Sequence, residues 1–510
     1  MASHEPTAKQ IRGLKPATVN MLVYLGALVI RLVAALGFTV YAASALGIDG
    51  YGQYSLIQSY FVIIASLSAV GINYTFIRRA AEEPHNTARL FTNALLLKLT
   101  LVAGSILLGL LVAWIVGYDS ETVRLMLLSF ISLLLFGTSD SFGALFNASE
   151  RLGLSSAQML IQNLVIYGGG IATLALGGGL AEVFVMFSVG YGATTALGYA
   201  YARREYTWQR LRLSPHLMRQ LLIPSLSFGT VRLLETLVIR FDFIYLELLH
   251  GESALGHYSV ANRLMWVVML IVTAYNQAFY PTFNRLKIQA EQRLSDFFRL
   301  STKLMSLLGL LLAVGVWILA RDIMGALFPK YMSAAPSLAV QSSALILLLA
   351  TSPILNLLYA RKQQNTVVLI LVISLVVDIL ANLLLVPRHG YMGTSWVPVI
   401  FSVTQFLLGA YCVRDVIRQE RLYTFGLRLV LLALVCVVFV ALVQPLPGTW
   451  RILGSLVALP SLYVTLIAAL GIFSPAERHQ LMSLAIGLVR PVGRRFFPVL
   501  ADSLAAGAQQ

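Results

Sequence analysis

The feature that most constrains this chain is a succession of long apolar runs, which continues from about residue 20 to residue 473 with short polar breaks. An α-helix needs about 20 predominantly apolar residues to cross the hydrocarbon core of a bilayer. Only 12% of the 510 residues are charged, roughly half the share that is usual in soluble domains. We therefore expect an all-α integral membrane protein without an independent soluble domain.

Breaks at glycine, proline and charged residues divide the apolar runs into about fourteen candidate transmembrane helices. They are expected near 20–45, 53–76, 91–117, 122–147, 154–178, 181–202, 220–248, 254–280, 301–328, 334–360, 364–387, 391–413, 425–445 and 451–473. The first run is longer than the apolar core of a signal peptide and carries Arg31 at its centre, so we expect it to be retained.

Basic residues are distributed unevenly between the two sets of loops that these spans define. The set that includes the N-terminus holds 27 of the 37 Lys and Arg residues, and the opposite set holds 5. Because an excess of Lys and Arg marks cytoplasmic loops, both termini are predicted to be cytoplasmic. This clustering explains the net charge of +15 without nucleic-acid binding. Cys412 and Cys436 lie in apolar runs and indicate neither a disulfide nor a metal site.

A short internal repeat suggests how the spans are grouped. Residues 52–55 read GQYS and residues 256–259 read GHYS, 204 positions apart, each at the start of a predicted helix. Internal repeats with a substrate site between the halves are common in secondary transporters. We therefore predict two pseudo-symmetric six-helix bundles, followed by two additional helices and an amphipathic cytoplasmic tail, over 1–210, 211–423, 424–473 and 474–510.

Several charged residues fall inside the predicted spans, where a charge costs roughly 2.5–3.5 kcal/mol at the bilayer centre. Such residues usually face a partner, a ligand or water. We predict four substrate-binding arginines, namely Arg31, Arg232, Arg240 and Arg263. Four acids are predicted to take part in ion coupling, namely Glu235, Asp242, Asp140 and Asp378.

The helical periodicity of span 220–248 places Arg232, Glu235 and Asp242 on a broad mixed-charge face, with Arg240 beside it. Such a face is expected to line a hydrated cavity rather than contact lipid tails. Two alternatives remain open: pairing of Arg232 with Glu235, and helix packing for Asp140 and Asp378. Lys98, near a span end, is expected to extend to the headgroups.

Gathered arginines favour an anionic substrate, because the planar guanidinium group binds phosphate oxygens in a fixed geometry. The pyrophosphate of a lipid-linked sugar has this chemistry. The predicted outer loops hold only scattered reactive residues, and no catalytic constellation, metal cluster or phosphate-binding loop is visible. We therefore expect no enzyme activity and no cofactor or metal. A membrane enzyme, such as a polymerase or an acyltransferase, is the rival from a different class.

Four motifs together resemble the Wzx-type polysaccharide flippases, which belong to the superfamily of the MATE exporters and the lipid II flippases. The motifs are LGIDGYGQYS at 46–55, GINY with two following arginines at 71–79, GHYSVANRL at 256–264 and NLLLVPRHGYMG at 382–393. The resemblance covers roughly residues 20–420. One departure is Thr394-Ser395, where the family usually has small alanines.

The resemblance implies two bundles that rock around a central cavity with alternating access, and cation coupling in some members. The implied cargo is a polyprenyl-pyrophosphate-linked oligosaccharide, such as an O-antigen, capsule or exopolysaccharide repeat unit. It would move from the inner to the outer leaflet of the bacterial cytoplasmic (inner) membrane. A monomer is expected, with glycosyltransferases or a polymerase of the same pathway as possible partners. A MATE-type multidrug or cation antiporter and a lipid II flippase remain alternatives.

Overall fold

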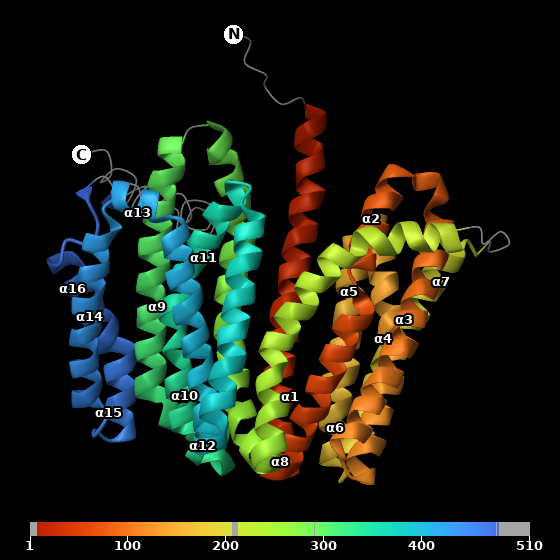
Figure 1. Cartoon of the computed structure of the whole chain (residues 1–510), viewed down its shortest axis with the longest axis horizontal. Helices are drawn as coiled ribbons and strands as arrows, with labels where there is room; N and C mark the ends of the chain where they lie inside the picture. Colours follow the sequence, from red (N-terminus) through yellow and green to blue (C-terminus); the bar gives the residue numbers. More distant parts are fainter. Residues whose placement is uncertain (1–7, 207–212, 290, 476, 479–510) are drawn as a thin grey trace. The chain divides into compact units, whose positions relative to one another are not determined.

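The computed structural model describes residues 8–206, 213–289, 291–475 and 477–478 (Figure 1). Within these residues the regular elements are helices, and ten of the helical stretches are long and apolar enough to cross a membrane. The predicted all-α membrane fold class is therefore confirmed. The predicted number of fourteen spans stays a prediction, because several long helices run through the positions where turns were expected.

The elements of the first part of the chain are α1 (Ala8–Ala69), α2 (Ile72–Glu82), η1 (Pro84–Asn86), α3 (Thr87–Val116), α4 (Ser120–Ala148), α5 (Leu152–Asn163), η2 (Leu164–Gly168), α6 (Gly169–Ala175), α7 (Leu180–Glu205) and α8 (Pro215–Gln289). Those that follow are α9 (Glu291–Leu327), η3 (Pro329–Ala334), α10 (Ala335–Ser342), α11 (Ala344–Ala360), α12 (Gln364–Cys412), α13 (Arg414–Gln419), α14 (Leu422–Val443), α15 (Gly448–Leu453), η4 (Gly454–Ala458) and α16 (Leu459–Ala469).

Three long helices, α1, α8 and α12, each contain a glycine with a positive φ that interrupts the helical backbone. These are Gly47 (φ 74°), Gly251 (φ 76°) and Gly390 (φ 54°). Side-chain-bearing residues seldom adopt this left-handed region, whereas glycine does so without steric cost. Each break falls between two of the predicted spans, so the glycines mark the turns that the sequence indicated.

The internal repeat is also present in the backbone geometry. Gly47 and Gly251 are 204 positions apart, as are the two GxYS motifs, and their ψ angles of −175° and −178° agree closely. Tyr54 and Tyr258 are both buried. Each phenol oxygen accepts a hydrogen bond from the amide four residues later, Gln58 at 3.4 Å and Asn262 at 3.5 Å. The same local structure therefore occurs twice.

The chain divides into two compact units, each assembled from separate segments. Unit 1 consists of 1–270, 321–341 and 371–401, and unit 2 consists of 271–320, 342–370 and 402–510. Both units contain parts of α8, α9 and α12. The predicted division into two six-helix bundles with two added helices stays a prediction.

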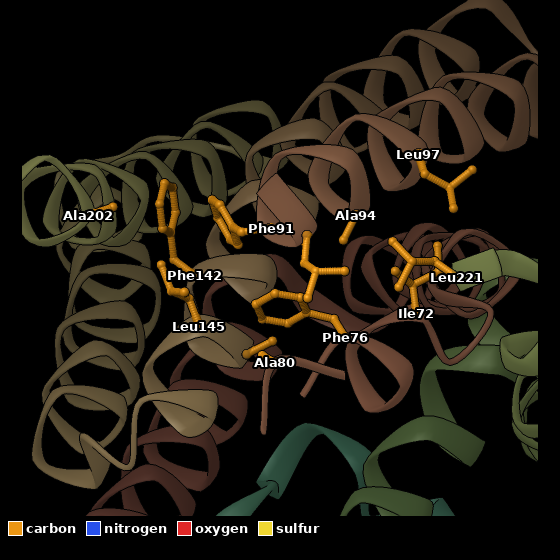
Figure 2. Close-up of a cluster of buried hydrophobic side chains, with 12 residues drawn as sticks. Ile72, Phe76, Ala80, Phe91, Ala94, Leu97, Phe142, Leu145, Ala202 and Leu221 are labelled. Carbon is orange, nitrogen blue, oxygen red and sulfur yellow. The ribbon is translucent and has the colours of Figure 1, made fainter. Parts of the chain in front are cut away.

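A cluster of buried apolar side chains forms a core of unit 1 (Figure 2). Phe76 on α2 packs edge-on against Phe91 on α3, with ring centroids 5.9 Å apart. Phe91 in turn contacts Phe142 on α4 at 5.2 Å. Ala202 on α7 and Leu221 on α8 complete the cluster. The first turns of α8 are therefore attached to the same core as α2, α3, α4 and α7.

Unit 2 is held partly by an ionic cluster around Glu477, just beyond α16. Lys303 on α9 donates to this carboxylate at 2.8 Å and Arg299 donates at 3.0 Å, while Arg299 also pairs with Glu420. The carboxylate and Ser474 cap each other's backbone N–H groups, which is a capping-box arrangement. These contacts attach the segment that follows α16 to α9.

Candidate functional site

Two of the four predicted arginines lie near each other in unit 1. Arg240, on the first half of α8, is half-buried, and its guanidinium carbon lies 5.2 Å from the centroid of the Phe243 ring. Its Nε is buried without a hydrogen-bond partner among the described residues. Arg263, on the second half of α8, lies close enough to Arg240 for the two positive charges to interact. Two neighbouring cations, one with an unused donor, form a favourable environment for an anion.

Tyrosine side chains surround Arg263. It donates a hydrogen bond to the phenol oxygen of Tyr51 and lies within electrostatic range of Tyr54 and Tyr167. The ring centroids of Tyr51 and Tyr54 are 5.7 Å apart, and Phe38 contacts both Tyr54 and Tyr167 at 5.8 and 5.5 Å. The arginine is thus held at an aromatic surface built from α1 and η2, which contains hydrogen-bonding groups.

Arg31 on α1 is exposed and has no ion-pair partner within the part of the chain that the structure describes. Tyr191 on α7 interacts electrostatically with Arg31. It also interacts with Tyr54 and Tyr167. The same two tyrosines neighbour Arg263. Arg31 and Arg263 are therefore connected through a shared group of aromatic side chains.

Arg232 is placed differently from these three arginines. Its side chain is 76% exposed, and it forms an ion pair of 3.2 Å with Glu235, one helical turn away. The structure thus shows the pairing that the sequence left open as an alternative. The backbone carbonyl of Arg232 also accepts a hydrogen bond from Thr236, which in turn bonds Ser66 on α1.

Two of the predicted acids, Asp242 and Asp378, are brought together by a third residue. Asn382 on α12 donates from Nδ2 to Asp242 at 2.8 Å and to Asp378 at 3.4 Å. The phenol of Tyr258 donates to the second oxygen of Asp242 at 3.1 Å. All four side chains are buried, and the carboxamide oxygen of Asn382 has no partner among the described residues. These oxygen atoms could hold a proton or a hard cation such as Na⁺.

Asp140 belongs to a separate network on α2, α3 and α4. Its carboxylate pairs with Lys98 and accepts a hydrogen bond of 2.8 Å from Asn73, whose own oxygen accepts from Lys98 at 3.2 Å. Lys98 is only 1% exposed. The expectation that Lys98 extends to the headgroups is wrong. Its partners come from two other helices, α2 and α4, and are distant from Lys98 in the sequence.

The sequence interpretation missed the polar side chains that connect the acids. Asn382 lies four residues after Asp378 in an apolar run, and this spacing places both on one helix face. Tyr258 belongs to the internal repeat and to the motif at 256–264, neither of which indicates a contact with Asp242. Asn73 lies within the GINY motif. The spacing from Asp378 was the available signal for Asn382, whereas the acids that Tyr258 and Asn73 contact lie 16 and 67 positions away in the sequence.

Comparison with known proteins gives the site its context. The family model described as "Polysaccharide biosynthesis protein" matches residues 17–287, which is more than half of the chain. The chain belongs to this family.

Two curated relatives of this polysaccharide biosynthesis family protein have names that refer to transport. The probable flippase AglR of Haloferax volcanii is 24% identical over 394 residues, which cover 72% of this chain and 76% of the relative. The succinoglycan biosynthesis transport protein ExoT of Rhizobium meliloti is 23% identical over 301 residues, covering 56% of this chain and 57% of the relative.

Solved structures establish the fold of this family member. A lipid II flippase MurJ in an inward closed conformation superimposes with a TM-score of 0.70 at 12% identity, covering 88% of this chain and 99% of that one. An inward-facing multidrug resistance MATE family transporter of the MOP superfamily gives 0.64 at 14% identity, covering 78% and 99%. The protein is thus a multi-pass membrane protein with the MOP fold, and the predicted resemblance is confirmed.

Proposed function

We propose that this protein moves a polyprenyl-pyrophosphate-linked oligosaccharide from the inner to the outer leaflet of the cytoplasmic membrane by alternating access. The family and the named relatives support the coarser statement, that the protein is a membrane transporter of polysaccharide precursors. The finer proposal includes cytoplasmic termini, following the distribution of basic residues, and a repeat unit supplied by glycosyltransferases of the same pathway.

The observation that carries the proposal is the Arg240–Arg263 pair with the unused Nε of Arg240. A half-buried guanidinium group without a counter-charge is unfavourable unless a ligand supplies one. The pyrophosphate of the lipid carrier provides several oxygens for two such groups. Arg31, exposed on α1 beside the same aromatic group, is proposed as a third contact. Tyrosine faces suit the sugar rings, because they pack against apolar C–H groups while their hydroxyls form hydrogen bonds.

Cation coupling is proposed for the Asp242–Asn382–Asp378 cluster. Two buried carboxylates that share one amide cannot both remain charged without a counter-ion. A proton or Na⁺ entering the cluster would neutralise it, and its release would restore the repulsion. A substrate-free transporter that must return to its starting state could use this difference, because a ligand shifts a conformational equilibrium by its differential affinity for the two states.

The test uses purified protein reconstituted in proteoliposomes, with a fluorescent polyprenyl-pyrophosphate oligosaccharide as the probe. Arg240→Gln and Arg263→Gln each remove a charge-assisted hydrogen-bond donor worth about 1.5–3 kcal/mol, so translocation is expected to fall by about 10- to 100-fold. The control is Arg89→Gln, an exposed arginine at the beginning of α3. Translocation at the wild-type rate by the Arg240→Gln/Arg263→Gln double variant would refute this site.

Transport assays with the same proteoliposomes distinguish the proposed flippase from a multidrug antiporter. A flippase of the proposed kind moves the lipid-linked oligosaccharide and leaves a lipophilic cation such as tetraphenylphosphonium where it is. Transport of the cation, with no movement of the labelled lipid, would replace the proposed function by the antiporter alternative.

A further inference from the structure

A basic pocket of about 470 Å³ lies between the end of α2 and the beginning of α8, both within unit 1. Its polar lining includes Arg78 and Arg79 from α2 and His216, Arg219 and Gln220 from α8. The lining also contains one acid, Glu82, against three arginines. None of these residues belongs to the Arg240–Arg263 pair or to the Asp242–Asn382–Asp378 cluster. The pocket therefore has a positive charge that the proposed transport chemistry does not use.

Buried contacts hold the two walls of this pocket together. Leu221, next to Gln220, packs in the core cluster beside Ile72 and Phe76 (Figure 2). The hydroxyls of Thr75, one turn before Arg79 on α2, and Ser225, one turn after Leu221 on α8, are 2.7 Å apart and buried. The guanidinium of Arg79 also donates to the Gln220 side chain across the pocket at 3.0 Å. The spacing of the basic groups is thus set by the core and not by flexible side chains alone.

The arginines retain donors for an additional ligand. Arg79 is positioned by Gln220, and its pairing distance of 3.5 Å to Glu83 is longer than a good charged hydrogen bond. Arg78 and Glu82 are 3.9 Å apart and largely exposed, so this pair is weak. Arg219 is exposed and has no ion-pair partner in the described part of the chain. Three guanidinium groups around one opening suit phosphate oxygens.

The pocket also has an apolar side. Ile223 lines it and is 53% exposed, and Leu226, one turn farther along α8, is exposed as well. In Figure 1 the first turns of α8 run across the group of helices α2, α3, α4 and α7, and Leu221 packs in their shared core cluster. A helix with basic and apolar residues in this arrangement lies in the headgroup region of a membrane. A ligand that combines phosphate with an acyl chain matches both sides of the pocket.

We propose that this pocket binds the phosphate headgroup of an anionic glycerophospholipid from the cytoplasmic leaflet. Arg78, Arg79 and Arg219 contact the phosphate, and Ile223 contacts the start of an acyl chain. A bound lipid of this kind would attach the first turns of α8 to the membrane surface. The inference does not depend on which cargo the protein moves.

The experiment measures lipid binding to the full-length protein in neutral detergent by native mass spectrometry, with dioleoyl-phosphatidylglycerol as the probe. The Arg78→Gln/Arg219→Gln variant is expected to bind it at least about tenfold more weakly than the wild type, because two guanidinium donors are lost. The matched control, Arg203→Gln/Arg204→Gln, removes the same charge from exposed positions at the end of α7 outside the pocket. This control is expected to keep wild-type affinity.

Further binding measurements test whether the pocket needs an acyl chain as well as a phosphate group, and whether positive charge alone explains the binding. Inorganic phosphate is expected not to displace the bound lipid, since it lacks an acyl chain, and dioleoyl-phosphatidylcholine is expected to bind weakly. The proposal is overturned if the pocket variant and the control lose affinity equally, which indicates nonspecific attraction. It is also overturned if a polyprenyl pyrophosphate binds at this site and phosphatidylglycerol does not. The single variant Arg219→Gln, at an exposed position, repeats the measurement should the double variant fail to fold.

Discussion

Gly52 and Gly256 are related by a reciprocal contact in which each packs against the backbone carbonyl of the residue four positions before the other. A methyl group added to Gly52 would lie 2.0 Å from the carbonyl oxygen of Glu252, and one added to Gly256 would lie 2.3 Å from that of Ile48. The two pairs are offset by the same 204 positions as the sequence repeat. The two copies of the repeat therefore pack closely against each other, in a pseudo-symmetric helix crossing.

Replacement of Gly52 by alanine is expected to destabilise the protein, because the added methyl group must push two backbones apart. Overpacking of this kind costs typically about 1–3 kcal/mol. The measurement is the melting temperature in detergent. Gly37→Ala on the same helix is the control, since a side-chain carbon there has open space and alanine is the better helix former. Equal melting temperatures for the two variants would contradict a tight crossing.

The buried Lys98 is expected to make Asp140 essential for stability. Lys98 is buried, whereas the Asp140 side chain is 39% exposed. Removal of one partner from a fully buried ion pair costs about 3–5 kcal/mol, and water at Asp140 makes this an upper bound here, whereas replacement of both partners by apolar residues is often neutral. Asp140→Leu should therefore lower the melting temperature sharply, and the Lys98→Met/Asp140→Leu double variant should recover most of it. The exposed pair of Arg78 with Glu82 provides the comparison, and Glu82→Gln should cost less than about 1 kcal/mol. A double variant that is as unstable as Asp140→Leu would exclude this explanation.

Glu477 makes the attachment of the segment after α16 sensitive to pH. Burial by itself would raise the pKa of Glu477, but hydrogen bonds from Lys303 and the Ser474 backbone, together with Arg299, lower it below its ordinary value. A carboxyl whose folded pKa is depressed stabilises the fold above its unfolded pKa of roughly 4.3, and this contribution is lost as the pH falls through the folded value. The other charged groups of this cluster are Lys303 and Arg299, which contact Glu477, and Asp296 and Glu420, which pair with Arg299.

Glu477→Gln is accordingly expected to lower the melting temperature at pH 7 and to differ progressively less from the wild type below about pH 4. The measurement is a series of thermal denaturation curves from pH 7.5 to pH 3.5 for both proteins. Asp415 supplies a comparison, because Arg361 also lowers its pKa although it is more exposed. A constant difference between Glu477→Gln and wild type across the series would show that lost packing, not charge, causes the destabilisation.

Asp242→Asn and Asp378→Asn are expected to abolish cation dependence of transport. Each variant removes one of the two buried carboxylates that Asn382 joins, so the mutual repulsion that ion binding relieves is lost. Translocation driven by a proton or Na⁺ gradient should fall by about tenfold or more, since a gradient acts only through a group that binds the ion. Glu247→Gln is the control, an acid on the same helix that accepts a hydrogen bond of 2.8 Å from Tyr118. Unchanged gradient dependence in both aspartate variants would remove the cluster from the coupling mechanism.

The membrane fold could be predicted from the sequence alone, because the free energy of inserting a helix depends mainly on the residues of that helix. The breaks at Gly47, Gly251 and Gly390 were foreseeable for a similar reason, since a left-handed backbone favours glycine locally. The repeat was visible as GxYS, although only the packing of Gly52 and Gly256 shows why the small residue is needed at both places.

The partners of the intramembrane charges were decided by the tertiary structure. Lys98 meets Asp140 across 42 positions, Asp242 meets Asn382 across 140 and Arg299 meets Glu477 across 178. The hydropathy of a segment depends only on the residues of that segment, so each membrane span can be predicted from its own stretch of sequence. Ion pairs and hydrogen bonds act over about 3–4 Å and depend on which helices are neighbours, so only the folded arrangement determines them.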